Sequence, residues 1–254
     1  MEYGISILAL VPLRKEPKDQ SEMISQILFG QHFKILKIED NWVFIKLSSD
    51  NYEGWICSKQ YFEITYEDYD NIELNDFAIV SDSFSNIINK DTNESIPITI
   101  GSTLPFYSKG NFRIRGNKYT YKGSTASKNK IDLIKYAYQF LNTPYLWGGK
   151  SILGIDCSGF SQQVYSLSGY NIPRDAFQQA AIGETISYKN RSSTDLVFFS
   201  KNKRIHHVGI LINKNQIIHA SGQVRIDELT EKGIINSKTK ELTHRFHSIK
   251  RIVE

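Results

Sequence analysis

The sequence predicts an α+β protein in which two small β-rich domains precede a third domain that begins with helices and ends with strands. Two observations lead to this prediction. Short apolar and aromatic segments, separated by turns rich in Gly, Asn and Asp, fill residues 3–62 and again residues 77–122. After residue 130 apolar residues recur at helical spacing, and strand-like segments return near residue 195. We therefore expect domains at residues 1–66, 67–124 and 125–254.

The composition is that of an ordinary globular protein, because 40% of the 254 residues are hydrophobic and 23% are charged. The net charge of +4 comes from Lys and Arg that are spread along the chain, so we expect no nucleic-acid partner. No apolar segment is long enough to cross a membrane, and we expect no membrane partner. Glu2 stands where a signal peptide carries positive charge, which predicts a cytoplasmic protein unless a leader has been removed. Cys57 and Cys157 fall in different predicted domains, which favours free thiols over a disulfide.

Residues 3–62 predict a small barrel of about five short strands. The segment WVFIKL at residues 42–47 alternates with period two, and turn residues precede and follow it. The run from FG through NWVFIKL to YEGWI resembles bacterial SH3-like domains, and the pair of Gly54 and Trp55 is its most recognisable part. This resemblance implies a first SH3-like barrel over residues 1–66.

Residues 63–76 are rich in acidic side chains and mark a domain boundary by their charge. The β-rich block that follows repeats the rhythm of short strands between turns, and it bears a weaker resemblance to a second SH3-like barrel over residues 67–124. No His or Cys lies between Cys57 and Cys157, so this block offers no catalytic cluster. We expect it to form a wall of the site or to serve packing alone.

The third domain follows a polar linker at residues 122–130. A first helix is predicted by apolar residues at helical spacing before Pro144, namely Ile131, Ile134, Tyr138 and Leu141. A glycine-rich loop then leads to a second helix, which we expect to begin at Cys157 and to end at Gly169. Asp156 is the candidate N-cap of this helix. A third short helix and four strands are predicted at residues 175–183, 195–200, 206–212, 216–221 and near the C-terminus.

Cys157 is the candidate nucleophile. At a helix N-terminus, unpaired backbone N–H groups stabilise a thiolate by roughly 0.3–1 kcal/mol, and they could also hold an oxyanion. Lowering a thiol pKa from about 8.5 to about 6.5 requires about 2.7 kcal/mol, so we expect a neighbouring imidazolium to keep the sulfur ionised. The polar neighbours Asp156, Ser158 and Gly159 argue against burial of Cys157 as a small hydrophobic residue.

The candidate base comes from the later strands. His206 and His207 are adjacent on one predicted strand, so they should point to opposite faces, and only one of them can meet Cys157. If residues 206–212 and 216–221 form a hairpin, His207 lies opposite His219 within hydrogen-bond reach. This predicts His207 as the general base of Cys157 and His219 as the residue that orients it, while His206 faces solvent. We expect the remaining histidines to be structural: His32, His244 and His247.

The same three residues, Cys157, His207 and His219, could hold zinc. Zinc sites usually contain a close-spaced ligand pair such as CxxC or HxxxH, and the sequence has no such pair. We therefore expect neither a metal nor another cofactor.

Five segments now point to a known family. Residues 145–147, DCSGF, DLVFF, HHVGI and IIHAS, in this order and spacing, resemble motifs of the NlpC family of bacterial cell-wall cysteine peptidases. The resemblance covers roughly residues 131–254 and implies a papain-like core with Cys157, His207 and His219 as the catalytic triad. With two SH3-like domains before it, the whole chain is similar to γ-D-glutamyl-L-diamino acid endopeptidases, which cleave the amide between D-γ-Glu and the diamino acid of murein peptides.

The resemblance also implies a requirement for a free N-terminal L-Ala, as in peptidases that recycle murein peptides. Acidic and tyrosyl groups would hold the amine of this residue, and other polar groups would line the substrate. The family often has Gly before DLVFF, where this chain has Thr194, which leaves the local turn in question. The substrate-binding residues implied by the resemblance are Asp156, Ser158, Tyr145, Tyr52 and Glu22.

Two other functions stay open at this point. The SH3-like pair would suit a non-catalytic peptidoglycan-binding module, and a papain-like core could transfer an acyl group to an acceptor other than water. A binding module would not need a nucleophile, a base and an orienting residue together, so hydrolysis is favoured. We expect a monomer whose partner is a murein peptide.

Overall fold

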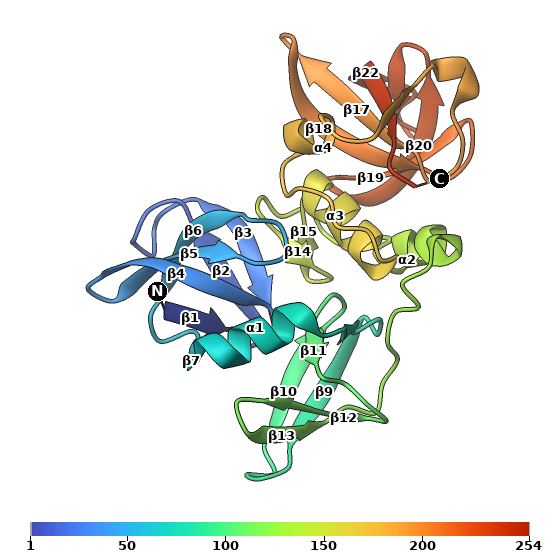
Figure 1. Ribbon diagram of the computed structural model, residues 1–254. Helices are drawn as coiled ribbons and strands as arrows, with labels where there is room; N and C mark the ends of the chain where they lie inside the picture. Colours follow the sequence, from blue (N-terminus) through green and yellow to red (C-terminus); the bar gives the residue numbers. More distant parts are fainter. Residues whose placement is uncertain (1, 254) are drawn as a thin grey trace. The chain divides into compact units, whose positions relative to one another are not determined.

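The computed structural model describes residues 2–253 and divides the chain into two compact units. The N-terminal unit comprises the residues up to Ala126 together with the short segment Lys150–Ile152. The C-terminal unit comprises Ser127–Gly149 and the residues from Leu153 onward. Figure 1 draws the N-terminal unit mainly in blue to green and the C-terminal unit mainly in yellow to red. In the described part of the chain, no helix is both long and apolar enough to cross a lipid bilayer.

The N-terminal unit opens with an antiparallel sheet whose seven strands follow the order β3-β2-β6-β5-β4-β1-β7. The predicted alternation is confirmed in β5, where Val43, Ile45 and Leu47 are buried and their neighbours are partly exposed. Gly54 is needed for packing, because a Cβ there would come within 2.8 Å of the Leu13 side chain. The strands are β1 (Glu2–Ile5), β2 (Leu10–Arg14), β3 (Met23–Leu28), β4 (His32–Glu39), β5 (Trp42–Leu47), β6 (Glu53–Cys57) and β7 (Phe62–Ile64).

A helix follows where the acidic segment indicated only a boundary. In α1 (Tyr66–Leu74) the side chain of Thr65 accepts from the N–H of Asp68, and the side chain of Asp68 accepts from the N–H of Thr65. This reciprocal cap satisfies two backbone donors at the start of the helix. Tyr69 and Ile72 form its buried face.

The second β-rich block forms a sheet in the order β10-β9-β13-β12 and a separate pair of strands, β11 and β8. It shares a hydrophobic core with the first sheet, because Ile5 and Phe29 cluster with Val80 and Ile87. The block therefore belongs to the same compact unit, and a second SH3-like barrel stays a prediction. The strands are β8 (Phe77–Ile79), β9 (Phe84–Asn89), β10 (Ser95–Thr99), β11 (Thr103–Pro105), β12 (Asn111–Ile114) and β13 (Asn117–Thr120).

The C-terminal unit packs helices against an antiparallel sheet in the order β16-β22-β17-β18-β19-β20-β21, which is the predicted α+β arrangement. β21 also pairs with β22, so the strands from β17 to β22 form a closed ring. Helix α3 lies beside α2 and against β18 and β19 (Figure 1). The helices are η1 (Lys130–Asp132), α2 (Leu133–Gln139), α3 (Cys157–Leu167), α4 (Ala176–Gln179) and η2 (Tyr188–Asn190).

Three strands of this sheet were not predicted, namely β16, β20 and β21, and β20 matters for the site. A short pair, β14 and β15, also lies in the glycine-rich loop before α3. The strands are β14 (Lys150–Ser151), β15 (Gly154–Ile155), β16 (Glu184–Ile186), β17 (Leu196–Lys201), β18 (Arg204–Leu211), β19 (Gln216–Ser221), β20 (Gln223–Thr230), β21 (Gly233–Ile235) and β22 (Leu242–Arg251).

Helix α2 buries a different face from the predicted one. Ile131 is 82% exposed, and Tyr138 and Leu141 are exposed as well. Both stripes of the helix are apolar, so spacing alone could not decide which of them faces the rest of the unit. The buried residues are Leu133, Tyr136, Ala137 and Phe140.

Thr194 occupies an irregular turn, at the position where the family pattern often has Gly. Its φ is 75°, in the left-handed region that a β-branched residue rarely adopts, at a cost of about 1–2 kcal/mol. Two hydrogen bonds hold the turn. The N–H of Thr194 donates to the carbonyl of Leu211 at 2.8 Å, and the hydroxyl of Tyr165 donates to the carbonyl of Thr194 at 2.5 Å.

Candidate active site

Cys157 is the first residue of α3, and Asp156 caps that helix, as predicted. Oδ1 of Asp156 accepts a hydrogen bond from the N–H of Gly159 at 2.7 Å. The preceding loop approaches this first turn closely, because a Cβ on Gly159 would come within 2.3 Å of the Gly149 carbonyl oxygen. The small residues of DCSGF therefore let the loop and the helix start meet, with Cys157 at the positive end of the helix dipole.

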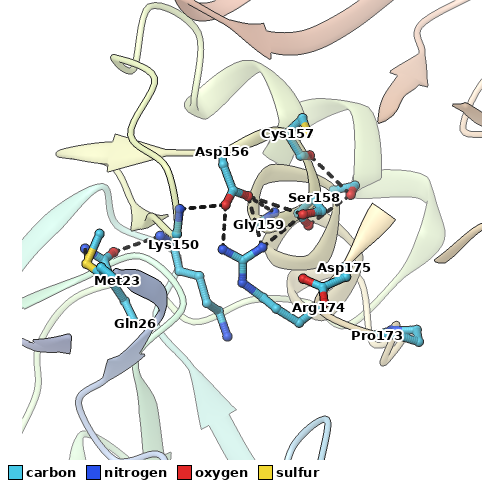
Figure 2. A network of polar contacts seen from close by, with 12 residues as sticks. Met23, Gln26, Lys150, Asp156, Cys157, Ser158, Gly159, Pro173, Arg174 and Asp175 are labelled. Atoms are coloured by element: carbon cyan, nitrogen blue, oxygen red, sulfur yellow. Dashed lines mark hydrogen bonds and ion pairs between the residues drawn. The ribbon is translucent and has the colours of Figure 1, made fainter. Parts of the chain in front are cut away.

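Asp156 is also paired with a buried arginine that the sequence did not indicate (Figure 2). Nη2 of Arg174 donates to Oδ2 at 2.7 Å, and Nη1 donates to Oδ1 at 3.0 Å. Nη1 also donates to Oγ of Ser158 at 2.9 Å, and the N–H of Gly148 donates to Oδ2 at 2.8 Å. Arg174 is 1% exposed and Asp156 is 4% exposed. The two buried charges are compensated by each other and by this network.

We expect the substitution Arg174→Met to lower the free energy of unfolding by about 3 kcal/mol, because it leaves the Asp156 carboxylate buried without its cation. Urea denaturation of the full chain measures this loss. The double variant Arg174→Met/Asp156→Asn should recover part of it, since Asn still caps a helix without a charge. Lys201→Met, which removes an exposed cation, should change stability by less than about 0.5 kcal/mol. A single variant as stable as the wild type would contradict this reading of the pair.

The sulfur of Cys157 is buried, with 6% of the residue exposed. Burial, followed by the nearby Asp156 carboxylate, raises the pKa of the Cys157 thiol to about 12. The N–H groups of Val208 and Ser158 donate to the sulfur and act in the opposite direction, as does Arg174. These effects disfavour the predicted resting thiolate, because desolvation outweighs the helix dipole. A base has to remove the thiol proton as the sulfur reacts.

His207 on β18 and His219 on β19 meet as predicted, but through a different register. The hairpin pairs Ile210 with Ile218, which is two residues away from the register that would place His207 opposite His219. A shift of two residues keeps both histidines on one face. Nε2 of His207 lies 2.8 Å from Nδ1 of His219. Gly209 leaves room for this approach, because a Cβ there would come within 2.9 Å of the His219 Cβ.

The hydrogen-bond chain continues to Asp227 on β20, a residue that the sequence did not single out. Nε2 of His219 lies 3.1 Å from Oδ2 of Asp227. Oδ1 accepts from Nη2 of Arg225 at 2.9 Å and from the N–H of Ser237 at 2.8 Å. Burial alone would raise the pKa of Asp227, but the hydrogen bonds from His219, Ser237 and Arg225 hold it well below its usual range. The buried carboxylate is therefore ionised.

The ionised Asp227 decides where both imidazoles carry their protons. Burial lowers the pKa of His219, and burial together with the neighbouring histidines lowers that of His207 much further, so both rings are neutral at neutral pH. An ionised carboxylate only accepts, so His219 carries its proton on Nε2 and presents the Nδ1 lone pair to His207. His207 then donates from Nε2 and keeps a lone pair on Nδ1. That is the protonation state that a general base needs.

The nucleophile and this base lie at the same part of β18. Val208, whose N–H donates to the sulfur of Cys157, directly follows His207. The geometry thus combines a buried thiol at a helix N-terminus with a neutral imidazole that two further groups orient.

Comparisons with known proteins identify two domains in the chain. Residues 142–243 match the profile of the NlpC/P60 family, and residues 13–60 match that of the bacterial dipeptidyl-peptidase Sh3 domain. Residues 142–243 therefore form an NlpC/P60 peptidase domain, and a bacterial Sh3 domain precedes it.

Individual relatives match this peptidase over most of the length of the chain. A gamma-D-glutamyl-L-lysine dipeptidyl-peptidase of Bacillus subtilis is 27% identical over 216 residues, which are 77% of this chain and 71% of the relative. A Bacillus cereus protein of the same name is 26% identical over 246 residues, which are 85% of this chain and 73% of the relative. A crystal structure of an NlpC/P60 family protein from Bacillus cereus superposes with a TM-score of 0.81 at 22% identity and covers 98% of this chain and 99% of that one. The fold is therefore shared.

Three of the five implied substrate-binding residues lie near the nucleophile of the NlpC/P60 domain. Tyr145 is 37% exposed, and burial, then Cys157 and Asp156, raise the pKa of its hydroxyl, which stays a hydrogen-bond donor. Ser158 is buried, and its hydroxyl belongs to the network of Arg174. Asp156 is engaged in the same network, so a contact between its carboxylate and a substrate amine stays a prediction.

The other two implied residues, Tyr52 and Glu22, belong to the N-terminal unit. Tyr52 packs, partly buried, against the core of the first sheet. Glu22 is exposed, and its Oε2 lies 3.5 Å from Nζ of Lys15. Their contact with a substrate stays a prediction.

The histidines expected to be structural fall into two groups. His32 pairs with Glu73 through Nε2 and Oε1, 2.5 Å apart, and His247 is exposed beside Ser248. His244 differs from the expectation, because its ring stacks on that of His207 in the peptidase site. His206 is exposed, as predicted. Among residues 2–253, no group of three or more His, Cys, Asp or Glu side chains is arranged to hold a metal ion.

Proposed function

We propose that this peptidase is a cysteine endopeptidase that hydrolyses the γ-D-glutamyl-L-diamino acid amide of murein peptides with a free N-terminal L-Ala, in the recycling of cell-wall peptides. The observation that carries the proposal is the buried chain from Asp227 through His219 to His207, the residue before Val208, whose N–H donates to the sulfur of Cys157. The activity in the names of the two Bacillus relatives supports the choice of bond. A module that only binds peptidoglycan would have no use for these buried ionisable groups, whose desolvation costs free energy.

The reaction follows from the protonation states. Nδ1 of His207 accepts the thiol proton as the sulfur of Cys157 attacks the amide carbon, and N–H groups at the start of α3 hold the oxyanion. The tetrahedral intermediate collapses, the C–N bond breaks, and His207 gives its proton to the leaving amine of the diamino acid. His207 then deprotonates a water molecule, which attacks the thioester. The C–S bond breaks, L-Ala-γ-D-Glu leaves, and the proton returns to Cys157.

The requirement for a free amine follows from the hydrogen bonds that an ammonium can donate. A free amino end would donate charge-assisted hydrogen bonds to the implied acidic and tyrosyl groups, and an acylated amino end cannot replace them. A peptide still linked to muramic acid lacks this amine. Such a site would spare the intact wall and consume released peptides.

Mass spectrometry of the products tests the proposal with L-Ala-γ-D-Glu-L-Lys and L-Ala-γ-D-Glu-meso-diaminopimelate, each with a free and with an acetylated amino end. We expect L-Ala-γ-D-Glu from at least one free peptide, and hydrolysis slower by about 10²-fold or more after acetylation. Equal rates for both amino ends would contradict the amine requirement. Absence of the dipeptide from both free substrates would contradict the assigned bond.

A further inference from the structure

A further imidazole lies against the proposed base. His244 on β22 stacks on the ring of His207, with ring centroids 4.1 Å apart and planes at 25°. Phe199, on the strand between them, lies 6.0 Å from His244 and 5.8 Å from His207 by ring centroids. His244 is half-buried, and its Nδ1 lies 2.9 Å from Oγ1 of Thr243. Contacts on two sides therefore fix the ring of His244 over the face of His207.

Two β-bulges produce this arrangement. The register between β17 and β18 shifts next to Phe199 and leaves His206 as an extra residue in β18. The register between β17 and β22 shifts at the same place and leaves His247 as an extra residue in β22. Bulges re-aim the side chains around them. Consequently the exposed ring of His206 lies 5.8 Å from that of His244 and almost parallel to it.

We infer that His244 is a positioning residue for His207: its neutral ring holds the imidazole plane and faces the positive charge that His207 acquires when it takes the proton of Cys157. This inference rests on the proposed function, in which His207 is the base. The face of a neutral aromatic ring attracts a cation, whereas a protonated His244 would repel the imidazolium. The stack thus favours the charged intermediate only while His244 itself is neutral.

Burial and two neighbouring imidazoles keep His244 neutral. The titratable and polar groups that face its ring are His206 and His207 on β18, His219 on β19, Asp227 on β20 and the hydroxyl of Thr243. Burial, then His219 and His206, lower the pKa of His244 to about 4, and Asp227 acts in the opposite direction. The ring is therefore uncharged at neutral pH and gains a proton only in acid. In the same way, a charged His244 lowers the pKa of His207.

Alkylation of Cys157 by iodoacetamide tests this inference without any peptide substrate. Peptide mapping separates Cys157 from the second free thiol, Cys57. At neutral pH we expect His244→Phe, which keeps a stacked ring, to react within about threefold of the wild-type rate, and His244→Ala to react about tenfold more slowly. The alkylation rate falls in acid as His207 becomes protonated. In His244→Phe this fall should occur at higher pH, because no charged His244 is present to lower the pKa of His207. His247→Ala, an exposed neighbour on the same strand, should match the wild type.

Each outcome decides the question. A wild-type rate in His244→Ala, with its fold verified by circular dichroism, would overturn the positioning role. Equal losses in the Phe and Ala variants would overturn the role of the ring, and an unmoved acid limb in His244→Phe would overturn the electrostatic part. Failure of the proposed function looks different. If the wild type cleaves no murein peptide while the alkylation pattern holds, only the substrate assignment is wrong.

Discussion

The substitution Cys157→Ala will abolish release of L-Ala-γ-D-Glu, with a loss in kcat of roughly 10⁵-fold or more. The sulfur of Cys157 forms the covalent bond to the acyl carbon in the proposed mechanism, and alanine offers no nucleophile in its place. The N–H groups at the start of α3 and the binding of the peptide remain, so a small residual rate over water is expected. Mass spectrometry of products after long incubation at high enzyme concentration measures the difference.

A matched control is available in the same chain. Cys57 is the other free thiol, on β6 of the N-terminal unit, and Cys57→Ala should retain full activity. This pair separates loss of the nucleophile from any general effect of removing a thiol. If Cys157→Ala turned over substrate at about 10⁻³ of the wild-type rate or faster, the proposed role of the sulfur would be ruled out, because the expected residual rate is far lower.

Local features of the site could be predicted because neighbouring residues decide them. Asp156 caps α3 and Cys157 begins it because a short acceptor followed by small residues specifies a helix start. His207 and His219 were placed on one face because strand alternation has a period of two, and an error of two residues in register leaves the face unchanged. The predicted hydrogen bond between the two imidazole rings is therefore present although the predicted strand register was wrong.

Tertiary features were missed for physical reasons. The protonated state of Cys157 depends on how much of the fold covers the sulfur, which local sequence does not reveal. Arg174 pairs with Asp156 across a loop and a helix, and no spacing rule marks such a pair. β20 was not predicted, so Asp227 had no face assigned to it. One signal was present in the sequence. Neighbouring side chains of a strand point to opposite faces, so an exposed Glu228 would have placed the Asp227 carboxylate on the inner face.

The substitution Asp227→Asn should lower kcat by about 10³–10⁴-fold while the fold remains intact. The carboxylate forces the proton of His219 onto Nε2, and through it leaves the Nδ1 lone pair of His207 available. An amide of the same shape can turn its NH₂ group toward His219, which then carries its proton on Nδ1 and donates to His207. His207 would in turn be protonated on Nδ1, the atom that has to accept the proton of Cys157.

The size of this effect distinguishes a fixed proton position from simple packing. Glu228→Gln makes the same chemical change at the next residue of β20, on an exposed side chain, and should leave kcat within about twofold of the wild type. Peptide hydrolysis gives the rates, and two-dimensional NMR of the imidazole nitrogens reports which of them carries the proton. If Asp227→Asn kept kcat within tenfold of the wild type, or left both tautomers unchanged, the carboxylate would not direct the protons of the site. In that case the transfer of the Cys157 proton would need another explanation. A neutral His207 can accept this proton only on a ring nitrogen that carries no proton, and in the proposed mechanism the hydrogen bonds from Asp227 and His219 keep Nδ1 in that state.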